Sequence, residues 1–194
     1  MPMSAQGVPG LDIACFTAGT RIRTKRGAVP VERLREGDLI ARLDGSMAPM
    51  VWLGKRTIRS ATHLNPDEVT PIRVRVGAFG REMPSRDLLL SPEHAVYVDG
   101  VLVPVRMLVD DEKILRERID FLRYFHVLLE RHAVIFAEDM PVESYLDTGR
   151  NGGFDNWQDV PLRTVFAEPC MPYVTPGPLL DGILAMMREM SATA

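Results

Sequence analysis

The stretch Val29-Pro30-Val31-Glu32-Arg33-Leu34 recurs 74 residues later as Val103-Pro104-Val105-Arg106-Met107-Leu108, with four identical residues in register. The same offset brings Ile40 onto Ile114 further along the chain. In each copy the proline is predicted to open a single helical turn. A repeat of this length is too long for a solenoid and indicates two related halves packed about a pseudo-twofold axis. Chance matching in a Val- and Leu-rich chain is the alternative explanation.

In the rest of the chain, turn-forming residues separate short segments, as is typical of a β protein. Its 15 prolines and 15 glycines recur at short intervals between segments such as residues 72–76, in which apolar and charged side chains alternate. A turn glycine, Gly27 or Gly100, stands between strand candidates in each half. The other strand candidates are residues 21–24, 38–42, 50–58, 87–90, 95–98, 112–118, 124–130 and 133–137. So many short strands predict an antiparallel, all-β domain.

Beyond Ser144 the composition changes. Residues 147–156 are rich in Gly and Asn, and residues 168–178 hold four prolines, so both segments are predicted to be loop or linker. In residues 179–190 the apolar side chains fall on one helical face, namely Leu179, Ile183, Met186, Met187 and Met190. We expect this short helix to cover the apolar surface of its own domain, with docking onto a partner as the alternative. The chain thus divides into a leader (1–14), a β domain (15–145) and a loop-rich extension (146–194).

Composition and charge argue against several classes of protein. With 46% hydrophobic and 25% charged residues, the 194-residue chain has the composition of a soluble globular protein with one substantial core. Its formal net charge of -3 gives no general basic field for a nucleic acid or an anionic membrane. No apolar run approaches the roughly 18 residues of a spanning helix, and residues 1–14 lack the features of a Sec signal. We expect a cytoplasmic or non-classically secreted protein with no nucleic-acid or membrane partner.

The first candidate for chemistry is Cys15, one of two cysteines, which are too few for a disulfide framework or a Cys-rich zinc site. It stands in a loop immediately before a strand. An ordinary thiol is only a few per cent thiolate at neutral pH, so a nucleophilic cysteine needs a base or an electropositive partner. The chain offers His63, His94, His126 and His132. A small buried hydrophobe is the alternative role for Cys15, and Cys170 is expected to be a free thiol in a linker.

His94 belongs to the sequence Ser91-Pro92-Glu93-His94, directly after an apolar run. A turn through the proline lets the Ser91 hydroxyl and the His94 imidazole face one spot, as a pair of donors for a carbonyl and its amide nitrogen requires. Under the internal repeat, this loop takes nearly the place of the Cys15 loop in the other half. A pseudo-twofold axis therefore brings the two loops together. The alternative is that His94 is a core histidine with a satisfied ring.

Together these motifs resemble the Hint domain of Hedgehog proteins and inteins, most closely its bacterial intein-like branch. The similar motifs are Cys15-Phe16-Thr17-Ala18-Gly19-Thr20, Val31-Glu32-Arg33-Leu34, Gly37-Asp38, Ser91-Pro92-Glu93-His94, and Arg131-His132 through Glu143-Ser144-Tyr145. They span residues 15–145 and occur in the order of the family. The resemblance implies a horseshoe-like β fold of two pseudo-symmetric halves, which agrees with the repeat.

The resemblance also implies an activity. In the family, the leading cysteine attacks the carbonyl of the preceding residue, so that an N-to-S acyl shift turns a peptide bond into a thioester. Carried over, Cys15 attacks the carbonyl of Ala14. His94 would lie near the Cys15 amide nitrogen, distort that amide and protonate it as it leaves. Ser91 stands where threonine is commoner and would hold the carbonyl or the amide.

Two further histidines are implied to support this chemistry. His132 occupies the position of the late histidine of the family, and His126 falls where inteins often carry an aspartate that helps to activate the thiol. An imidazole at position 126 could serve as base or stabilise the thiolate. Six-residue spacing along one strand would put both rings on the same sheet face, so a zinc site with His94 is the alternative; we expect no metal and no cofactor. His63 is expected in a solvated loop.

The residues after His132 determine which reaction follows. Full splicing needs an asparagine beside a second nucleophile, but the chain continues as Ala133-Val134-Ile135-Phe136, so splicing is not expected. Position 144 is Ser where Hedgehog proteins carry Cys. The chain's own N-terminal segment is the expected substrate, and water, a thiol or another small nucleophile is the expected acceptor. The alternative is a catalytically idle Hint-like module with a structural or protein-binding role.

Overall fold

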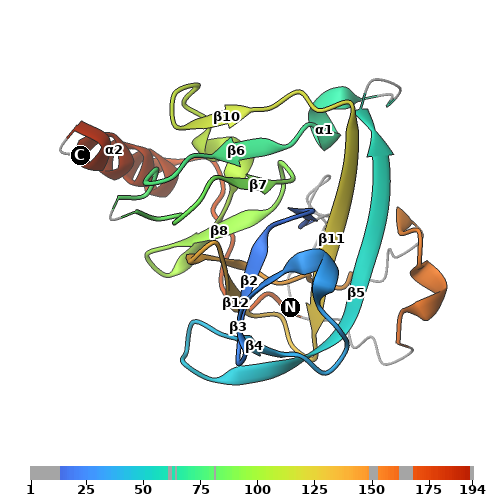
Figure 1. Cartoon of the computed structure of the whole chain (residues 1–194). Coiled ribbons are helices and arrows are strands. Elements are labelled where there is room, and N and C mark those ends of the chain that lie inside the picture. The colour runs from blue at the N-terminus through green and yellow to red at the C-terminus, as the bar shows by residue number, and fades with distance from the viewer. Residues whose placement is uncertain are drawn as a thin grey trace, which may run out of the picture.

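The computed structural model describes residues 14–60, 63, 65–80, 82–148, 153–161 and 168–192. Its thirteen strands form one antiparallel sheet in the order β10-β6-β7-β1-β11-β5-β4-β2-β12-β13-β8-β9, with β3 paired to β2 (Figure 1). The strands are β1 Phe16–Thr17, β2 Arg21–Thr24, β3 Gly27–Pro30, β4 Leu39–Ala41, β5 Met47–Arg59, β6 Ile72–Val74, β7 Leu88–Leu90, β8 Ala95–Val98, β9 Val101–Pro104, β10 Ile114–Arg116, β11 Phe121–Leu129, β12 Val134–Ala137 and β13 Met140–Glu143. The predicted antiparallel, all-β fold is confirmed.

The order of the elements repeats with the offset seen in the sequence. The hairpin β2–β3 and the 3-10 turn η1 (Val31–Arg33) correspond to the hairpin β8–β9 and the turn η3 (Val105–Leu108). The turn glycines do not superpose, because Gly27 is the first residue of β3 whereas Gly100 lies inside its turn, beside Asp99 at φ 46°. The two halves therefore share their element order while closing their hairpins differently.

The neighbours of β1 determine where Cys15 lies. This two-residue strand pairs with β11 on one side, where Phe16 faces Phe125, and with β7 on the other, where Phe16 faces Leu90. The long strands β5 and β11 run side by side along one side of the molecule (Figure 1). Because Cys15 immediately precedes β1, it lies between residues of β11 and the loop that follows β7.

Several boundaries differ from the sequence predictions. β5 begins at Met47 and contains Pro49, and β13 contains Pro141, although proline ordinarily argues against a strand interior. The short helix α1 (Pro66–Val69) lies in a segment expected to be loop. Residues 157–159 form a further 3-10 turn, η5 (Trp157–Asp159). The predicted leader, apart from Ala14, lies outside the described residues.

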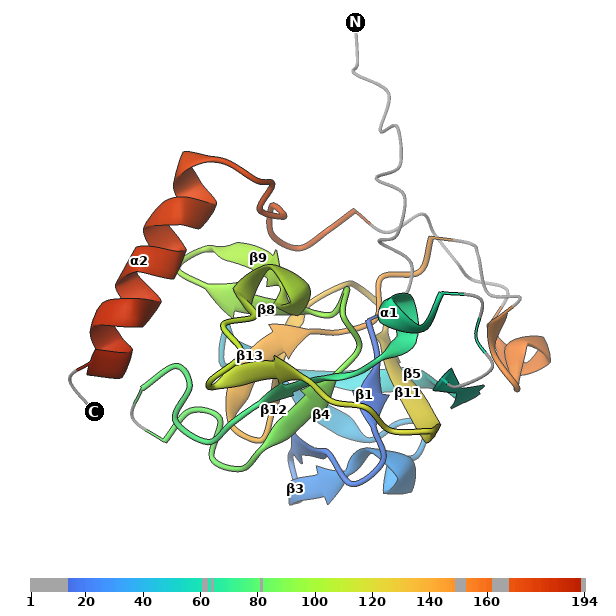
Figure 2. The same ribbon diagram turned by 90° about the horizontal axis from the view of Figure 1, so that it is seen from above.

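The C-terminal helix α2 (Pro178–Ala192) packs against the β domain (Figure 2). Leu180, Ile183 and Met187 are buried in the main hydrophobic core. This favours the expectation that the helix covers the apolar surface of its own domain. The predicted face is partly wrong, since Leu179, Met186 and Met190 are 58%, 39% and 38% exposed. No helix in the described part of the chain has the length and apolarity needed to cross a membrane.

Candidate functional site

Cys15 is buried, with 1% of its surface exposed, and Ser91 hydrogen-bonds both its backbone N–H and its backbone carbonyl. The Cys15 N–H donates to Ser91 Oγ at 2.9 Å, and the Ser91 backbone N–H donates to the Cys15 carbonyl at 3.1 Å. The same hydroxyl also hydrogen-bonds the Cys15 thiol. One side chain thus touches both the nitrogen and the sulfur that an acyl shift exchanges.

His94 lies on the other side of the Cys15 backbone. Its Nδ1 is 3.0 Å from the Cys15 carbonyl oxygen and its Nε2 is 3.1 Å from the Glu143 carbonyl oxygen. A neutral imidazole has one N–H, so it donates to only one of these acceptors at a time. Burial lowers the pKa of His94. Cys15 and His94 therefore meet. The sequence predicts a contact of the ring with the Cys15 amide nitrogen, but the ring contacts the Cys15 carbonyl, and the amide N–H is bound to Ser91.

His126 faces the thiol from β11. Its Nε2 is 3.2 Å from Cys15 Sγ, and the ring also hydrogen-bonds the backbone of Ala14. Its Nδ1 is buried with no hydrogen-bond partner among the described residues, and the ring centroid lies 5.3 Å from that of Tyr145 and 4.5 Å from that of Phe154. Burial lowers the pKa of His126 well below its usual value. A neutral imidazole thus lies beside both the Cys15 thiol and the Ala14 carbonyl, which the thiol would attack.

The thiol is also kept neutral. Burial raises the pKa of Cys15 strongly, while the Ser91 hydrogen bond and the Arg56 guanidinium oppose that rise. A buried thiol of this kind is a poor nucleophile until a neighbouring base takes its proton. His126 is the histidine in contact with the sulfur, so the chemistry depends on proton transfer inside the site.

Gly54 makes room for His126, which it faces across the β5–β11 pair. A Cβ at position 54 would lie 2.6 Å from the Trp52 ring and 3.1 Å from the His126 Cβ. We therefore expect Gly54→Ala to lower the free energy of unfolding by about 1–3 kcal/mol, as overpacking does, and to displace His126. Urea unfolding measures the first effect. The matched control is Gly182→Ala in α2, where a Cβ meets nothing within 4 Å; a Gly54→Ala protein as stable as this control would contradict the packing argument.

Two of the three buried histidines, His94 and His126, predict a loss of stability in acid. His94 and His126 have lowered pKa values in the folded chain, so below pH about 6.5 the unfolded chain binds more protons than the folded one. Each of these histidines then lowers the free energy of unfolding by about 1.4 kcal/mol per pH unit, for as long as it stays neutral in the folded chain. His132, whose pKa is raised to about 9, has the opposite effect until the unfolded chain is also protonated there, so the range to measure is pH about 6 and below. Urea unfolding at pH 6, 5.5 and 5 should show this slope, reduced by about half in His126→Gln. A flat profile over this range would contradict it.

His132 is in a different place from the one expected. It follows the end of β11, so it does not share a strand face with His126. Its Nε2 is 3.2 Å from Glu143 Oε2, and its Nδ1 accepts the Cys170 backbone N–H at 3.0 Å. Its carboxylate partner Glu143 also contacts His94 through its backbone carbonyl, and the His132 charge acts on His94 directly. Cys170, expected to be a free linker thiol, is anchored to this ring.

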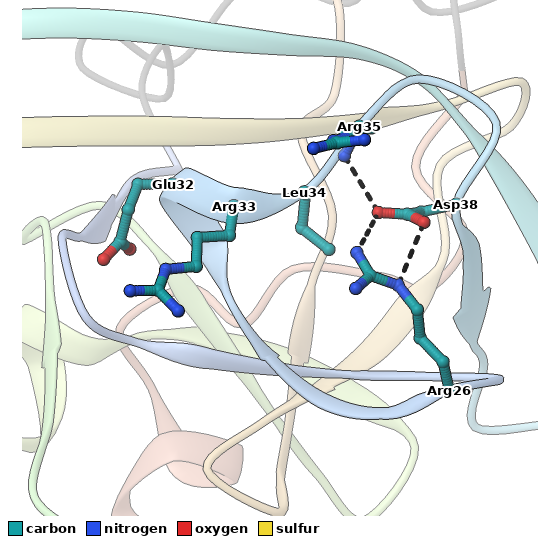
Figure 3. Close-up of a pocket in the computed structure, with 6 residues that line it drawn as sticks. All are labelled: Arg26, Glu32, Arg33, Leu34, Arg35 and Asp38. Carbon is teal, nitrogen blue, oxygen red and sulfur yellow. Dashed lines mark hydrogen bonds and ion pairs between the residues drawn. The ribbon is translucent and has the colours of Figure 1, made fainter.

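A pocket beside η1 and the arrangement of possible metal ligands both point away from these residues. Within the described ranges, no group of three or more His, Cys, Asp or Glu side chains is placed to hold a metal ion, so nothing in the geometry favours the zinc alternative. His63 contacts the Asn65 backbone in its loop. The pocket in Figure 3 lies beside η1, where Arg26 and Asp38 form an ion pair at 2.8 Å. Its lining residues are Arg26, Glu32, Arg33, Leu34, Arg35 and Asp38, none of which takes part in the Cys15 site.

Comparison with known proteins places the chain in a family. The family model described as the Hint domain matches residues 14–149. The chain belongs to the Hint domain family. This match begins one residue before Cys15 and includes Ser91, His94 and His126, so the site lies wholly within the Hint domain. No curated protein matches the chain.

Solved structures share the Hint fold. The bacterial intein-like domain from Clostridium thermocellum is 15% identical, with a TM-score of 0.50, over 69% of this chain and 99% of that one. A variant of the gp41-1 intein is 14% identical with a TM-score of 0.47, also over 69% and 99%. The DnaB intein from Synechocystis sp. PCC 6803 is 11% identical with a TM-score of 0.45, over 68% and 99%. At these identities the likeness concerns the fold.

Sequence reasoning missed three residues around the site. Gly54 and Arg56 lie on β5, and nothing local in the sequence marks their approach to His126 and Cys15. Glu143 was noticed only as part of a family motif, although its backbone contacts His94 and its carboxylate contacts His132. The only available signal for Glu143 was a charged residue at the end of an otherwise apolar strand segment.

Proposed function

We propose that this Hint domain performs an N-to-S acyl shift at the Ala14–Cys15 peptide bond, followed by N-terminal cleavage or acyl transfer without splicing. The observation that carries the proposal is the double contact of Ser91. Its hydroxyl hydrogen-bonds both the amide nitrogen that leaves and the sulfur that attacks. A purely structural serine needs only one of these partners.

The first step of the proposed reaction begins at the thiol. His126 Nε2 takes the Cys15 proton as the sulfur forms a bond to the Ala14 carbonyl carbon. The resulting imidazolium then donates its Nε2–H to the Ala14 carbonyl oxygen, where negative charge builds. Donors aimed at a developing oxyanion in a water-poor site are among the largest contributions to catalysis. For Nε2 to accept the thiol proton, the neutral ring must carry its own proton on Nδ1, the nitrogen with no hydrogen-bond partner among the described residues.

Collapse of the tetrahedral intermediate breaks the C–N bond. Ser91 donates its hydroxyl proton to the departing nitrogen, and the proton held by His126 restores the neutral serine. The net change is one S–H bond replaced by one N–H bond, with the acyl group moved from nitrogen to sulfur. His94 holds the Cys15 carbonyl throughout, so the leaving half of the peptide stays in place. General acid–base transfer of this kind contributes about 100-fold or more.

The thioester is then resolved from outside. The strand that follows His132 contains no asparagine, so the cyclisation that completes splicing has no residue to act on there. Water, a thiol or another small nucleophile attacks the thioester carbonyl, and the sulfur of Cys15 leaves as a thiolate. The products are the acylated acceptor and a chain that begins at Cys15.

The test is intact-mass measurement of the purified chain with and without hydroxylamine. The proposal predicts loss of residues 1–14 and recovery of that peptide as the hydroxamate of Ala14, which identifies a thioester and distinguishes it from proteolysis. Ser91→Ala is expected to slow this release, and His63→Gln serves as the matched control that leaves the rate unchanged. A mass that stays constant under hydroxylamine, in a protein shown to be folded, would support the idle-module alternative.

A further inference from the structure

Glu143 connects the Cys15 site to the segment of the chain that follows the Hint domain. The residue is buried, with 2% of its surface exposed, and its carboxylate has donors on both oxygens. Oε1 accepts the Ala95 N–H at 2.6 Å, while Oε2 accepts the Tyr173 hydroxyl and lies 3.2 Å from His132 Nε2. The proposed acyl shift uses neither oxygen. Because a buried carboxylate is costly without its hydrogen bonds, these donors hold it in one position.

The backbone and the side chain of Glu143 both bear on the position of His94. The Glu143 carbonyl oxygen is 3.1 Å from His94 Nε2, and Oε1 holds the N–H of Ala95, the next residue along the chain. The strands that carry the two contacts, β13 and β8, are paired beside them. The other ring nitrogen, Nδ1, is 3.0 Å from the Cys15 carbonyl oxygen. A displacement of Glu143 therefore displaces the His94 ring relative to Cys15.

Tyr173 belongs to an anchored segment that lies outside residues 14–149, the part of the chain that the Hint family model matches. The Leu102 N–H donates to the Pro172 carbonyl at 2.9 Å, and the Val174 N–H donates to the Leu102 carbonyl at 2.8 Å. Hydrogen bonds on both sides of Tyr173 thus keep its hydroxyl at the buried carboxylate. A residue of the extension completes the hydrogen bonding of a side chain that belongs to the Hint domain.

We propose, on the basis of the proposed acyl shift, that Glu143 and Tyr173 are positioning residues for His94, through which the C-terminal extension sets the rate of that shift. Tyr173 holds the Glu143 carboxylate, and Glu143 holds His94 on its Nε2 side. His94 in turn holds the Cys15 carbonyl. The sulfur then reaches the Ala14 carbonyl carbon with the leaving half of the peptide already in place. Neither positioning residue touches the bonds that form and break.

The test is the dependence of leader release on hydroxylamine concentration, in the full chain and in Tyr173→Phe. At high concentration the rate constant reaches that of the acyl shift itself. At low concentration it equals the equilibrium constant of the shift multiplied by the rate of thioester attack. A positioning residue speeds the shift in both directions, so Tyr173→Phe is expected to lower the limiting rate constant about 3-fold. The half-saturating concentration should fall by the same factor, which leaves the initial slope unchanged.

Tyr97→Phe is the matched control. Tyr97 packs against the same apolar cluster as Tyr173, but its hydroxyl is not among the donors to Glu143 in the described part of the chain, so neither constant should change. Glu143→Gln removes the charge and keeps an acceptor for the Ala95 N–H, and it should lower the limiting rate constant about 10-fold. A Tyr173→Phe chain that loses initial slope and limiting rate equally would show a structural role only and would overturn the proposal.

A second measurement does not require release of the leader. In a 15N-labelled Cys15→Ala chain, the shifts of the His94 ring nitrogens report how the ring proton is shared between its two contacts. Adding Tyr173→Phe should change these shifts, and adding Tyr97→Phe should leave them as they are. If wild type releases no leader, the proposed function fails while this measurement still tests the positioning. Unchanged His94 shifts in Tyr173→Phe, or a limiting rate constant equal to that of Tyr97→Phe, would contradict the inference.

Discussion

Replacing Cys15 by alanine is expected to abolish the hydroxylamine-dependent loss of residues 1–14. The sulfur is the nucleophile of the proposed reaction, and its contacts with Ser91 and His126 place it beside the Ala14 carbonyl. A methyl group at this position cannot form a thioester. Intact-mass measurement over a time course, on wild type and Cys15→Ala side by side, gives the result directly.

The folding of the Cys15→Ala protein can be checked independently. Removing one buried sulfur leaves a small cavity, which costs far less than truncation of a large core side chain. Urea unfolding should therefore still show a cooperative transition. Loss of the same leader from a folded Cys15→Ala chain would mean that another nucleophile or a contaminating protease cuts the bond, and the acyl-shift mechanism would fall.

Replacing His126 by alanine is expected to slow the same release by about 100-fold or more, the usual contribution of a general base. The His126 Nε2 lies 3.2 Å from the buried sulfur, and the raised pKa of the thiol keeps it protonated unless a base takes the proton. The imidazole also contacts the Ala14 backbone, so its loss removes support for the oxyanion. The first-order rate constant at saturating hydroxylamine measures the effect.

His63→Ala is the matched histidine control for this experiment. His63 contacts only the backbone of its own loop among the interactions described, so its removal should leave the rate constant unchanged. If His126→Ala releases the leader as fast as wild type, the thiol must lose its proton to an acceptor other than His126. That outcome would reassign the base while leaving the nucleophile in place.

The repeating part of the fold could be predicted from the sequence because local patterns of residues determine its strands and turns. The strands β2 and β8 were predicted with the bounds that the structure gives, and the proline-led turns were found where η1 and η3 lie. The strand β13 was not predicted, and β5 was predicted three residues short at its start, because Pro49 and Pro141 argue against strands. Long-range pairing overrides that local preference.

Less of the site than of the fold could be predicted from the sequence. The sequence repeat correctly places the Ser91 loop against Cys15, because β1 runs next to β7. It could not show that Ser91 accepts the Cys15 N–H while His94 contacts the Cys15 carbonyl, since both backbone groups belong to the same residue. The anchoring of Cys170 on His132 joins residues 38 positions apart across a segment predicted to be linker, and no local pattern encodes it.

The parallel bridge between Leu102 and Tyr173 has a consequence for solubility. β9 is the last strand of the sheet, and an uncovered terminal strand offers its backbone groups to other chains. The segment around Tyr173 uses the Leu102 N–H and carbonyl itself. Shortening the protein before this segment would therefore uncover the Leu102 backbone groups for pairing with another chain, so we expect the shortened protein to aggregate more readily.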